Sequence, residues 1–556
     1  MSLPEKNFRP SLPWLGLAFA LALVLRLLRL GELPLSDAEA AWALQALHLL
    51  RAQPLTMGAN PLYVHLTALF FFIFQPGNAA ARLLPALAGS FLVFLPGLFG
   101  DRLSQKSALL LAFLLACDPG LLALSRQAGS LIPGLTLALF AWGFWRKNRA
   151  DWAGIFAGLA LLSGPALWGG LLALALALGL TRGLLPLSDF EIESASLRRA
   201  GLYALGAFLA FGSFFLLSPG GLGAAFRLPL ENFFSPGALP PLMILAAPLI
   251  YQPLALIFGL MAALRGLRAR DPLRIFLGLW WLAAWILALL PIFQPGGLAW
   301  AQIPLLALAA LELADRLIPF QAGRAETLAM AALTVLLLTF VGLTLTAAAI
   351  GNLDATSAQL YGLVALAALL MLAISVALVA QGWNTAIAWQ GAFSGGLAVL
   401  AAYTLSAAFF SAQLKPRPSV EIWADGPSIA QAAALENQMN ELSLLQRGAP
   451  RALDVTLVGF SSPALEWLLR DWPLSLQADF SPTSSPALMI TPEGFSTPQL
   501  ESAYRGADFR WRNYPGWGAA SFGDWTRWLV EHSLPSGEEN LLLWARADLF
   551  SHPSQP

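Results

Sequence analysis

Charged residues are scarce in this sequence: Asp, Glu, Lys and Arg together make up 12% of its 556 residues, whereas hydrophobic residues make up 57%. A typical soluble domain has about a quarter charged residues, and its core cannot bury so much apolar surface. The 32 basic residues equal the 32 acidic residues in number, so the formal net charge is +0. Without a basic field, the chain is not expected to bind nucleic acid. The composition therefore predicts a polytopic membrane protein.

Cysteine and histidine are also rare. The one cysteine, Cys117, excludes a disulfide within the chain and any zinc site built from several thiolates. The four histidines, at His48, His65, His532 and His552, are too far apart to show metal-ligand spacing. The sequence also lacks a glycine-rich nucleotide-binding loop, a P-loop and a Gly-x-Ser-x-Gly motif. We therefore expect no metal, no other cofactor and no nucleotide-sugar donor.

Lys and Arg cluster between pairs of apolar runs, as they do in short cytoplasmic loops. The clusters are Arg102/Lys106, Arg146/Lys147/Arg149, Arg182/Arg198/Arg199, Arg265/Arg268/Arg270/Arg274 and Arg316/Arg324. The first apolar run, from about Leu12 to Leu30, has no small-residue cleavage site, so we expect it to be retained as a helix. Counting from a cytoplasmic N-terminus predicts about 13 transmembrane helices. An odd number places the C-terminus outside the cytoplasm.

The composition changes near residue 415. The last apolar run ends near Phe410, and Lys415-Pro416-Arg417-Pro418 follows as a proline-rich joint. Residues 1–414 are therefore predicted to form an all-α transmembrane domain, and residues 415–556 an extracytoplasmic α/β domain. Its predicted strands are Asp454 to Phe460, Ala487 to Ile490 and Asn540 to Trp544, with a helix over Ser428 to Gln446.

Residues 36–76 differ from the other apolar stretches because polar residues occur in them at helical spacing. Ser36 to Gln53 is amphipathic, so we expect a helix along the membrane surface, with Ser36 as its N-cap. The run from Asn60 to Phe74 is predicted as a second juxtamembrane helix, since the following run can then end on the cytoplasmic side at Asp101-Arg102.

Several short segments of the first 180 residues resemble, in their order and spacing, the N-terminal half of GT-C glycosyltransferases. The resemblance is to protein O-mannosyltransferases, aminoarabinose-transferase-like enzymes and the bacterial and archaeal proteins associated with flippase activity. The segments are Arg26-Leu27-Leu28-Arg29-Leu30, Asp37-Ala38-Glu39, Pro61-Leu62-Tyr63, Arg82-Leu83-Leu84-Pro85-Ala86-Leu87-Ala88-Gly89 and Ser125-Arg126-Gln127-Ala128. The resemblance implies a GT-C-like membrane domain.

The resemblance also implies an activity, the transfer of a sugar from a polyprenyl-phosphate donor to an acceptor at the outer membrane face. Asp37 matches the outer-loop aspartate that acts as the base or orients the nucleophile in such enzymes, and Glu39 would be its partner or an alternative base. A carboxylate in this position can take the proton of an acceptor hydroxyl as the bond to the sugar forms. Stabilisation of the helix N-terminus alone would also explain both acids.

Cations and polar residues near the outer face are candidates for donor binding. Arg126 matches the position that binds the lipid-linked phosphate in the resembling enzymes. An arginine suits this role, because it can hold a phosphate with two parallel hydrogen bonds. The alternative is that Arg126 is a snorkelling side chain. Arg227, in the long loop from Ser218 to Pro240, is a second candidate for the phosphate. Tyr63 and His65 could line the same cavity, although a lone histidine on an apolar helix more often fills space.

The sequence departs from the resembling enzymes in two places. The positions directly after Ser125-Arg126, Gln127 to Leu131, contain no acidic residue, and Leu162-Ser163-Gly164-Pro165 stands where a Thr-Lys pair is common. Two alternatives to an enzyme therefore stay open, a non-catalytic GT-C homologue and a flippase-associated or transport component. In every case the expected location is the cell membrane. The expected partners are the lipid bilayer, a polyprenyl-phosphate sugar and a glycan, lipid or protein acceptor.

Overall fold

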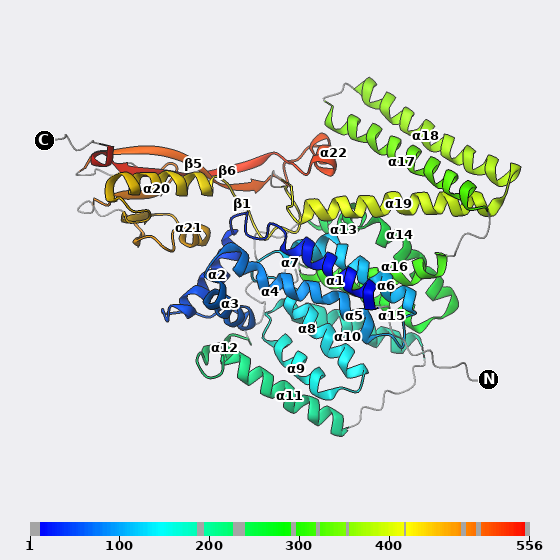
Figure 1. Cartoon of the computed structure of the whole chain (residues 1–556), viewed down its shortest axis with the longest axis horizontal. Helices are drawn as coiled ribbons and strands as arrows, with labels where there is room; N and C mark the ends of the chain where they lie inside the picture. Colours follow the sequence, from blue (N-terminus) through cyan, green and yellow to red (C-terminus); the bar gives the residue numbers. More distant parts are fainter. Residues whose placement is uncertain are drawn as a thin grey trace.

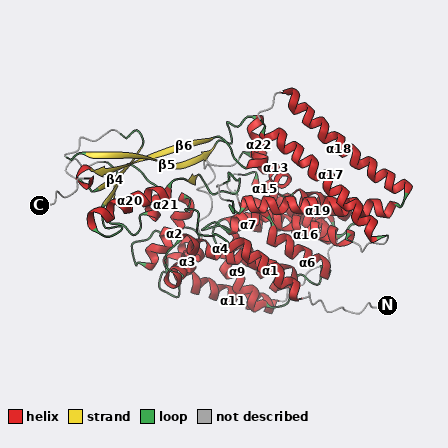
Figure 2. Cartoon of the chain, turned by 45° about the horizontal axis from the view of Figure 1, so that its top comes forward, coloured by secondary structure: helices red, strands yellow, loops and turns green. Residues whose placement is uncertain are grey.

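The structure is a computed structural model, which describes residues 12–185, 194–225, 240–290, 296–317, 323–351, 355–415, 419–479, 485–495 and 502–550. Helices form a large bundle, and strands gather at one end of the molecule in a smaller C-terminal domain (Figures 1 and 2). A mostly helical chain with a C-terminal sheet domain is confirmed, and the domain boundary near residue 415 stays a prediction. The proline-rich joint lies mostly outside the described residues.

The bundle is formed by helices α1 to α19. Those of the first half are α1 (Leu12–Leu27), α2 (Asp37–Leu50), α3 (Pro61–Phe74), α4 (Asn78–Phe91), α5 (Leu95–Leu98), α6 (Gln105–Cys117), α7 (Pro119–Ser125), α8 (Ile132–Arg146), α9 (Ala150–Leu161), α10 (Ala166–Leu184) and α11 (Ser194–Gly212). Those of the second half are α12 (Gly220–Ala224), α13 (Pro241–Tyr251), α14 (Pro253–Ala269), α15 (Pro272–Ala288), α16 (Gly296–Arg316), α17 (Arg324–Ile350), α18 (Ala355–Gly382) and α19 (Thr385–Ser411).

Six of the described helices are long and apolar enough to cross a membrane, and the number rises to eight if each of two bent helix pairs is one span. Four more apolar helices, including α1 and α3, are shorter than a span of about 20 residues. A multi-pass membrane protein is therefore supported. The count of about 13 crossings and the sidedness of the termini stay predictions.

Helix α2 begins where the sequence predicted it. The Ser36 side chain accepts the backbone N–H of Glu39, and the Glu39 carboxylate accepts the N–H of Ser36, which is a complete capping box. The helix ends at Leu50, close to the predicted Gln53. Both α2 and α3 pack against the C-terminal domain, and the ring of Phe71 on α3 stacks on Trp467 at 5.6 Å.

Glycines allow α9 and α11 to pack closely, as small residues do between membrane helices. A Cβ atom on Gly158 would lie 2.3 Å from the carbonyl oxygen of Ala204, whereas one on Gly201 of α11 would meet nothing within 4 Å. We therefore expect Gly158→Ala to destabilise the protein by about 1–3 kcal/mol through overpacking, measured by thermal unfolding in detergent. Gly201→Ala is the matched control and should cause no loss; equal effects of the two changes would contradict this account.

The described residues of the C-terminal domain form a six-stranded sheet in the order β1-β5-β6-β4-β2-β3. The strands are β1 (Ser428–Ile429), β2 (Val455–Val458), β3 (Leu474–Gln477), β4 (Leu488–Pro492), β5 (Tyr504–Pro515) and β6 (Ser536–Arg546), and the helices are α20 (Ala432–Arg447), α21 (Pro463–Leu468) and α22 (Phe522–Glu531). Strand β2 is parallel to β3 and β4, while β5 and β6 form a long antiparallel pair.

The three strands that the sequence predicted correspond to β2, β4 and β6. The predicted helix over Ser428 to Gln446 is wrong at its start, because Ser428–Ile429 pairs with β5 and the helix begins only at Ala432. The pairing partner of this short strand lies more than 80 residues away, so no local pattern announces it. The domain core is continuous with buried side chains of α2 and α3, so these two helices and the sheet domain are one packed unit, while their place along the membrane surface stays a prediction.

Candidate active site

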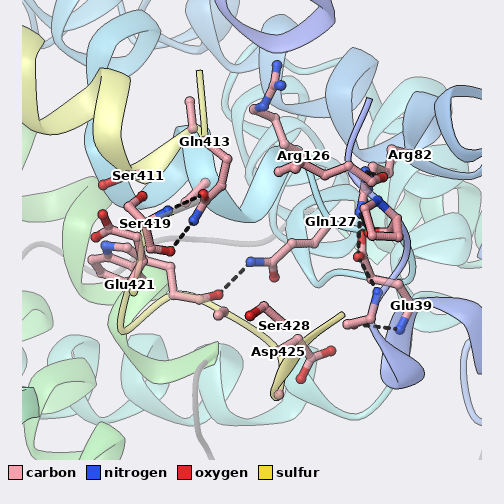
Figure 3. Close-up of a pocket in the computed structure, with 18 of the residues that line it drawn as sticks. Glu39, Arg82, Arg126, Gln127, Ser411, Gln413, Ser419, Glu421, Asp425 and Ser428 are labelled. Atoms are coloured by element: carbon pink, nitrogen blue, oxygen red, sulfur yellow. Dashed lines mark hydrogen bonds and ion pairs between the residues drawn. The ribbon is translucent and has the colours of Figure 1, made fainter. Parts of the chain in front are cut away.

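A cavity of about 150 Å³ lies where the helical bundle meets the C-terminal domain. Its walls come from four parts of the chain: the end of α1 and the start of α2, Arg82 on α4, the end of α7, and the segment from α19 to β1. In Figure 3, the Glu39–Arg82 pair lies on one side and Glu421 on the other, Gln127 and Asp425 lie between them, and Arg126 lies above Gln127 with its guanidinium toward the top of the view. Charged groups of both signs therefore meet in one small space.

Glu39 and Arg82 form a buried ion pair in the cavity wall. Arg82 Nε lies 2.7 Å from Glu39 Oε1 and Arg82 Nη2 lies 2.6 Å from Oε2, which is a two-bond arrangement. The remaining Arg82 donors bind the carbonyl oxygens of Leu30, Leu33 and Pro34 in the turn before α2. Glu39 Oε1 also accepts the N–H of Ala128 at 2.9 Å. All hydrogen-bonding groups of this pair are occupied, so its geometry is that of a structural brace.

Arg126 presents a different arrangement. Its Nη1 donates to the carbonyl oxygens of Leu25, Arg26 and Leu28 at the end of α1, at 2.9–3.0 Å. Its Nε and Nη2 make no hydrogen bond or ion pair to any residue that the structure describes. Arg29 also lines the cavity and is paired with Glu32. The site thus contains one arginine that is fixed at one end and has donors left for an anion.

Asp37 does not line the cavity. Its Oδ1 accepts hydrogen bonds from the Ser462 hydroxyl at 2.6 Å and the Ala464 N–H at 2.9 Å, and its Oδ2 accepts one from Arg512 Nε at 2.6 Å. All three donors belong to the C-terminal domain. The Asp37 carboxylate therefore joins the start of α2 to that domain.

The other predicted site residues lie apart from the cavity or outside the described structure. The Tyr63 hydroxyl is buried and donates to the Ala81 carbonyl oxygen at 2.7 Å. His65 is buried, with Nδ1 2.8 Å from the Phe211 carbonyl oxygen and its ring stacked on Phe214. Arg227 lies outside the described residues. Of the six predicted site residues, the structure brings Glu39 and Arg126 into one cavity.

Two acids of the cavity were not singled out in the sequence, Glu421 and Asp425. Glu421 is buried, accepts a hydrogen bond from the Tyr251 hydroxyl at 2.5 Å and lies 2.8 Å from Nδ1 of His532. Asp425 is open to the cavity. For these two acids the sequence contains one local signal: Asp425 stands in Asp425-Gly426-Pro427, a tripeptide typical of a turn. Both acids follow the last long apolar helix in the sequence, and this position could have marked them as candidate site residues.

The described residues include no group of three or more His, Cys, Asp or Glu side chains close enough to hold a metal ion. Of the cavity acids, Glu39 is paired with Arg82 and Glu421 lies next to Tyr251 and His532, whereas Asp425 has no hydrogen-bond or ion-pair partner among the described residues. Transfer without a metal or another cofactor stays a prediction for this chain.

No family model matches the chain, and none of the curated proteins has a significantly similar sequence. Among solved structures, ArnT from Cupriavidus metallidurans bound to undecaprenyl phosphate aligns over 98% of this chain and 100% of its own, with 15% identity and a TM-score of 0.55. The apo form of ArnT gives the same coverage, with 16% identity and a TM-score of 0.54. An oligosaccharyltransferase from Archaeoglobus fulgidus aligns over 86% of this chain and 68% of its own, with 14% identity and a TM-score of 0.42. The agreement with ArnT extends over bundle and sheet domain alike, and this chain therefore has the fold of the GT-C membrane glycosyltransferases.

Proposed function

We propose that this protein is a membrane glycosyltransferase that moves a sugar from a polyprenyl-phosphate-linked donor to an acceptor at the outer membrane face. The observation that carries the proposal is an arginine with unused donors, Arg126, in a cavity between apolar helices and a sheet domain. The binding of undecaprenyl phosphate by ArnT, which has the same fold, supports the choice of donor. The acceptor is a glycan, a lipid or a protein, and the C-terminal domain lies outside the cytoplasm.

Donor binding follows from the free donors of Arg126. A phosphate placed against Nε and Nη2 would receive two parallel hydrogen bonds, while the bonds from Nη1 to α1 hold the guanidinium in place. Charge-assisted bonds of this kind strengthen as the leaving phosphate gains negative charge, so they lower the barrier to transfer. Arg29 lies close enough to line the same cavity, and Arg227 stays a proposed second phosphate ligand. The negative charge of Glu39 balances the positive charge of Arg82 in their ion pair.

Removal of the acceptor proton is the role that the family resemblance implies for Asp37. In the described arrangement, its three hydrogen bonds to the C-terminal domain keep both oxygens occupied. Because Asp37 does not line the cavity, it can act as a base on an acceptor bound there only if the contact between the start of α2 and the C-terminal domain rearranges. The alternative role within the same proposal is to anchor that domain above the cavity.

Paired substitutions separate these roles of Asp37. We expect Asp37→Asn to lower transfer of labelled sugar from a polyprenyl-phosphate donor pool, measured in membranes with matched protein amounts. Arg512→Met breaks the same ion pair but leaves the carboxylate in place. If Asp37 is the base, transfer falls about 10²- to 10⁴-fold with Asp37→Asn and much less with Arg512→Met. Similar losses in both variants mean that Asp37 is an anchor.

The same assay tests the proposed function itself. Product from the unmodified protein identifies the acceptor class by mass. If labelled sugar crosses the membrane without a new covalent bond, the protein is a transport component. If no sugar is transferred or moved, a non-catalytic homologue is the better description.

A further inference from the structure

The Asp425 carboxylate is the feature of the cavity that the proposed function has not used. It is exposed to the cavity, and it forms no hydrogen bond or ion pair with any residue that the structure describes. The other carboxylates of the cavity, Glu39 and Glu421, both have close partners. In Figure 3, the Asp425 side chain lies in the open space near Glu39 and Gln127. An acid that is free to meet a ligand is therefore present in the cavity.

The chain before Asp425 is held firmly. Trp423 is buried, and its ring contacts the ring of Tyr251 at 5.4 Å. The Gln127 side chain donates to the Trp423 carbonyl oxygen at 2.5 Å. Val420 is bound at both backbone groups, because its N–H donates to the His532 carbonyl oxygen and its own carbonyl accepts Trp528 Nε1. Side chains of the bundle and of the C-terminal domain thus fix this segment together.

The chain after Asp425 is held as well. Ser428 and Ile429 pair with Asn513 and Arg512 of β5, and Arg512 binds Asp37 at the start of α2. Asp425 therefore lies between two segments whose contacts hold them in place, and each segment is only a few residues away along the chain. These contacts fix the backbone of Asp425 at the cavity wall, so its carboxylate can take only a limited range of positions, which favours proton transfer from a bound acceptor.

A purely structural role does not account for Asp425. An aspartate before a glycine commonly stabilises a turn by accepting a nearby backbone N–H. Gly426 has a φ of +111°, which provides the turn without such help, and Asp425 accepts no N–H from the described residues. Nor does Asp425 pair with Arg29, Arg82 or Arg126, although all three line the same cavity.

We propose that Asp425 is the base that accepts the proton of the acceptor hydroxyl during sugar transfer, an inference that rests on the proposed function. The acceptor oxygen forms a bond to the anomeric carbon, and the bond from that carbon to the donor phosphate breaks. The electron pair of the broken bond leaves with the lipid phosphate, beside Arg126. The proton of the hydroxyl moves to Asp425 and from there to water.

The surroundings of Asp425 suit this role. Two causes raise the pKa of Asp425 to about 6: enclosure by protein, which is the larger, and the negative charge of Glu39, which is the smaller. The other charged groups facing the cavity are Arg29, Arg82, Arg126 and Glu421. A base must be deprotonated to act, so kcat/KM should fall as the pH drops below about 6 and level off above it. A base with a pKa near the working pH combines proton affinity with the correct charge state.

The test compares Asp425→Asn with the unmodified protein, using a panel of undecaprenyl-phosphate-linked hexoses and pentoses as labelled donors. One reaction contains membranes with the natural acceptor pool. The other contains sodium azide, a nucleophile that has no proton to lose. We expect Asp425→Asn to lower transfer to the acceptor pool by about 10²- to 10⁴-fold, to retain glycosyl azide formation, and to lose the acidic limb of the pH profile.

Asp508→Asn is the matched control, because Asp508 is an exposed aspartate of β5 that does not line the cavity. It should transfer sugar at the unmodified rate, and both variants should melt at the unmodified temperature. Full transfer by Asp425→Asn, or equal loss with acceptor and azide, overturns the inference. If Asp37→Asn, rather than Asp425→Asn, loses transfer to the acceptor pool but retains glycosyl azide formation, the base is Asp37. If the unmodified protein uses no donor of the panel, the proposed function fails, and the inference falls with it.

Discussion

Replacing Arg82 by methionine is expected to destabilise the protein by about 3–5 kcal/mol, because a buried carboxylate would lose its charged partner. The side chains of Arg82 and Glu39 are only 8% and 6% exposed. The substitution also removes three hydrogen bonds to the turn between α1 and α2, so the start of α2 would lose its connection to α4. Thermal unfolding in detergent measures the effect.

A surface pair provides the control for this substitution. Arg51 and Asp471 form an ion pair whose side chains are 37% and 40% exposed, so Arg51→Met should cost less than about 1 kcal/mol. The double variant Glu39→Gln/Arg82→Met should be more stable than the sum of the single changes predicts, since no unpaired charge is left. Additive losses would mean that the two side chains act independently, contrary to the geometry.

Replacing Arg126 by glutamine is expected to lower kcat/KM for sugar transfer by about 10²- to 10³-fold, the size typical of a lost donor to developing charge. Lysine at this position keeps the charge but cannot form two parallel bonds, so Arg126→Lys should be intermediate. Undecaprenyl phosphate is the probe for binding, and its affinity should weaken in the same order. Transfer of labelled sugar and binding of this lipid are measured on the same preparations.

Arg102→Gln is the matched control for Arg126→Gln, because Arg102 is exposed and does not line the cavity. It should change neither lipid binding nor transfer. Thermal unfolding separates loss of function from loss of the bonds between Arg126 and α1. If Arg126→Gln binds undecaprenyl phosphate as tightly as the unmodified protein while folded, Arg126 is only a brace for α1.

Much of the fold was predictable because its signals are local. Apolar runs longer than about 20 residues predict membrane spans, and the structure has several such helices. The capping box at Ser36 and Glu39 requires only four consecutive residues, and the structure contains it. The strands β2, β4 and β6 were recognised from short apolar runs. The start of α20 was misplaced, because β1 exists only through its pairing with β5.

The candidate site was predictable only in part. The sequence alone determined the membrane class, the two kinds of domain and the acids at the start of α2, since these depend on composition or on neighbours within one helical turn. Tertiary structure decided their partners: Glu39 meets Arg82 across 43 residues and Asp37 meets Arg512 across 475. It also left Asp425 without a hydrogen-bond or ion-pair partner among the described residues around the cavity. Such contacts depend on how the whole bundle and the sheet domain pack together, because side chains so far apart in sequence become neighbours only through packing.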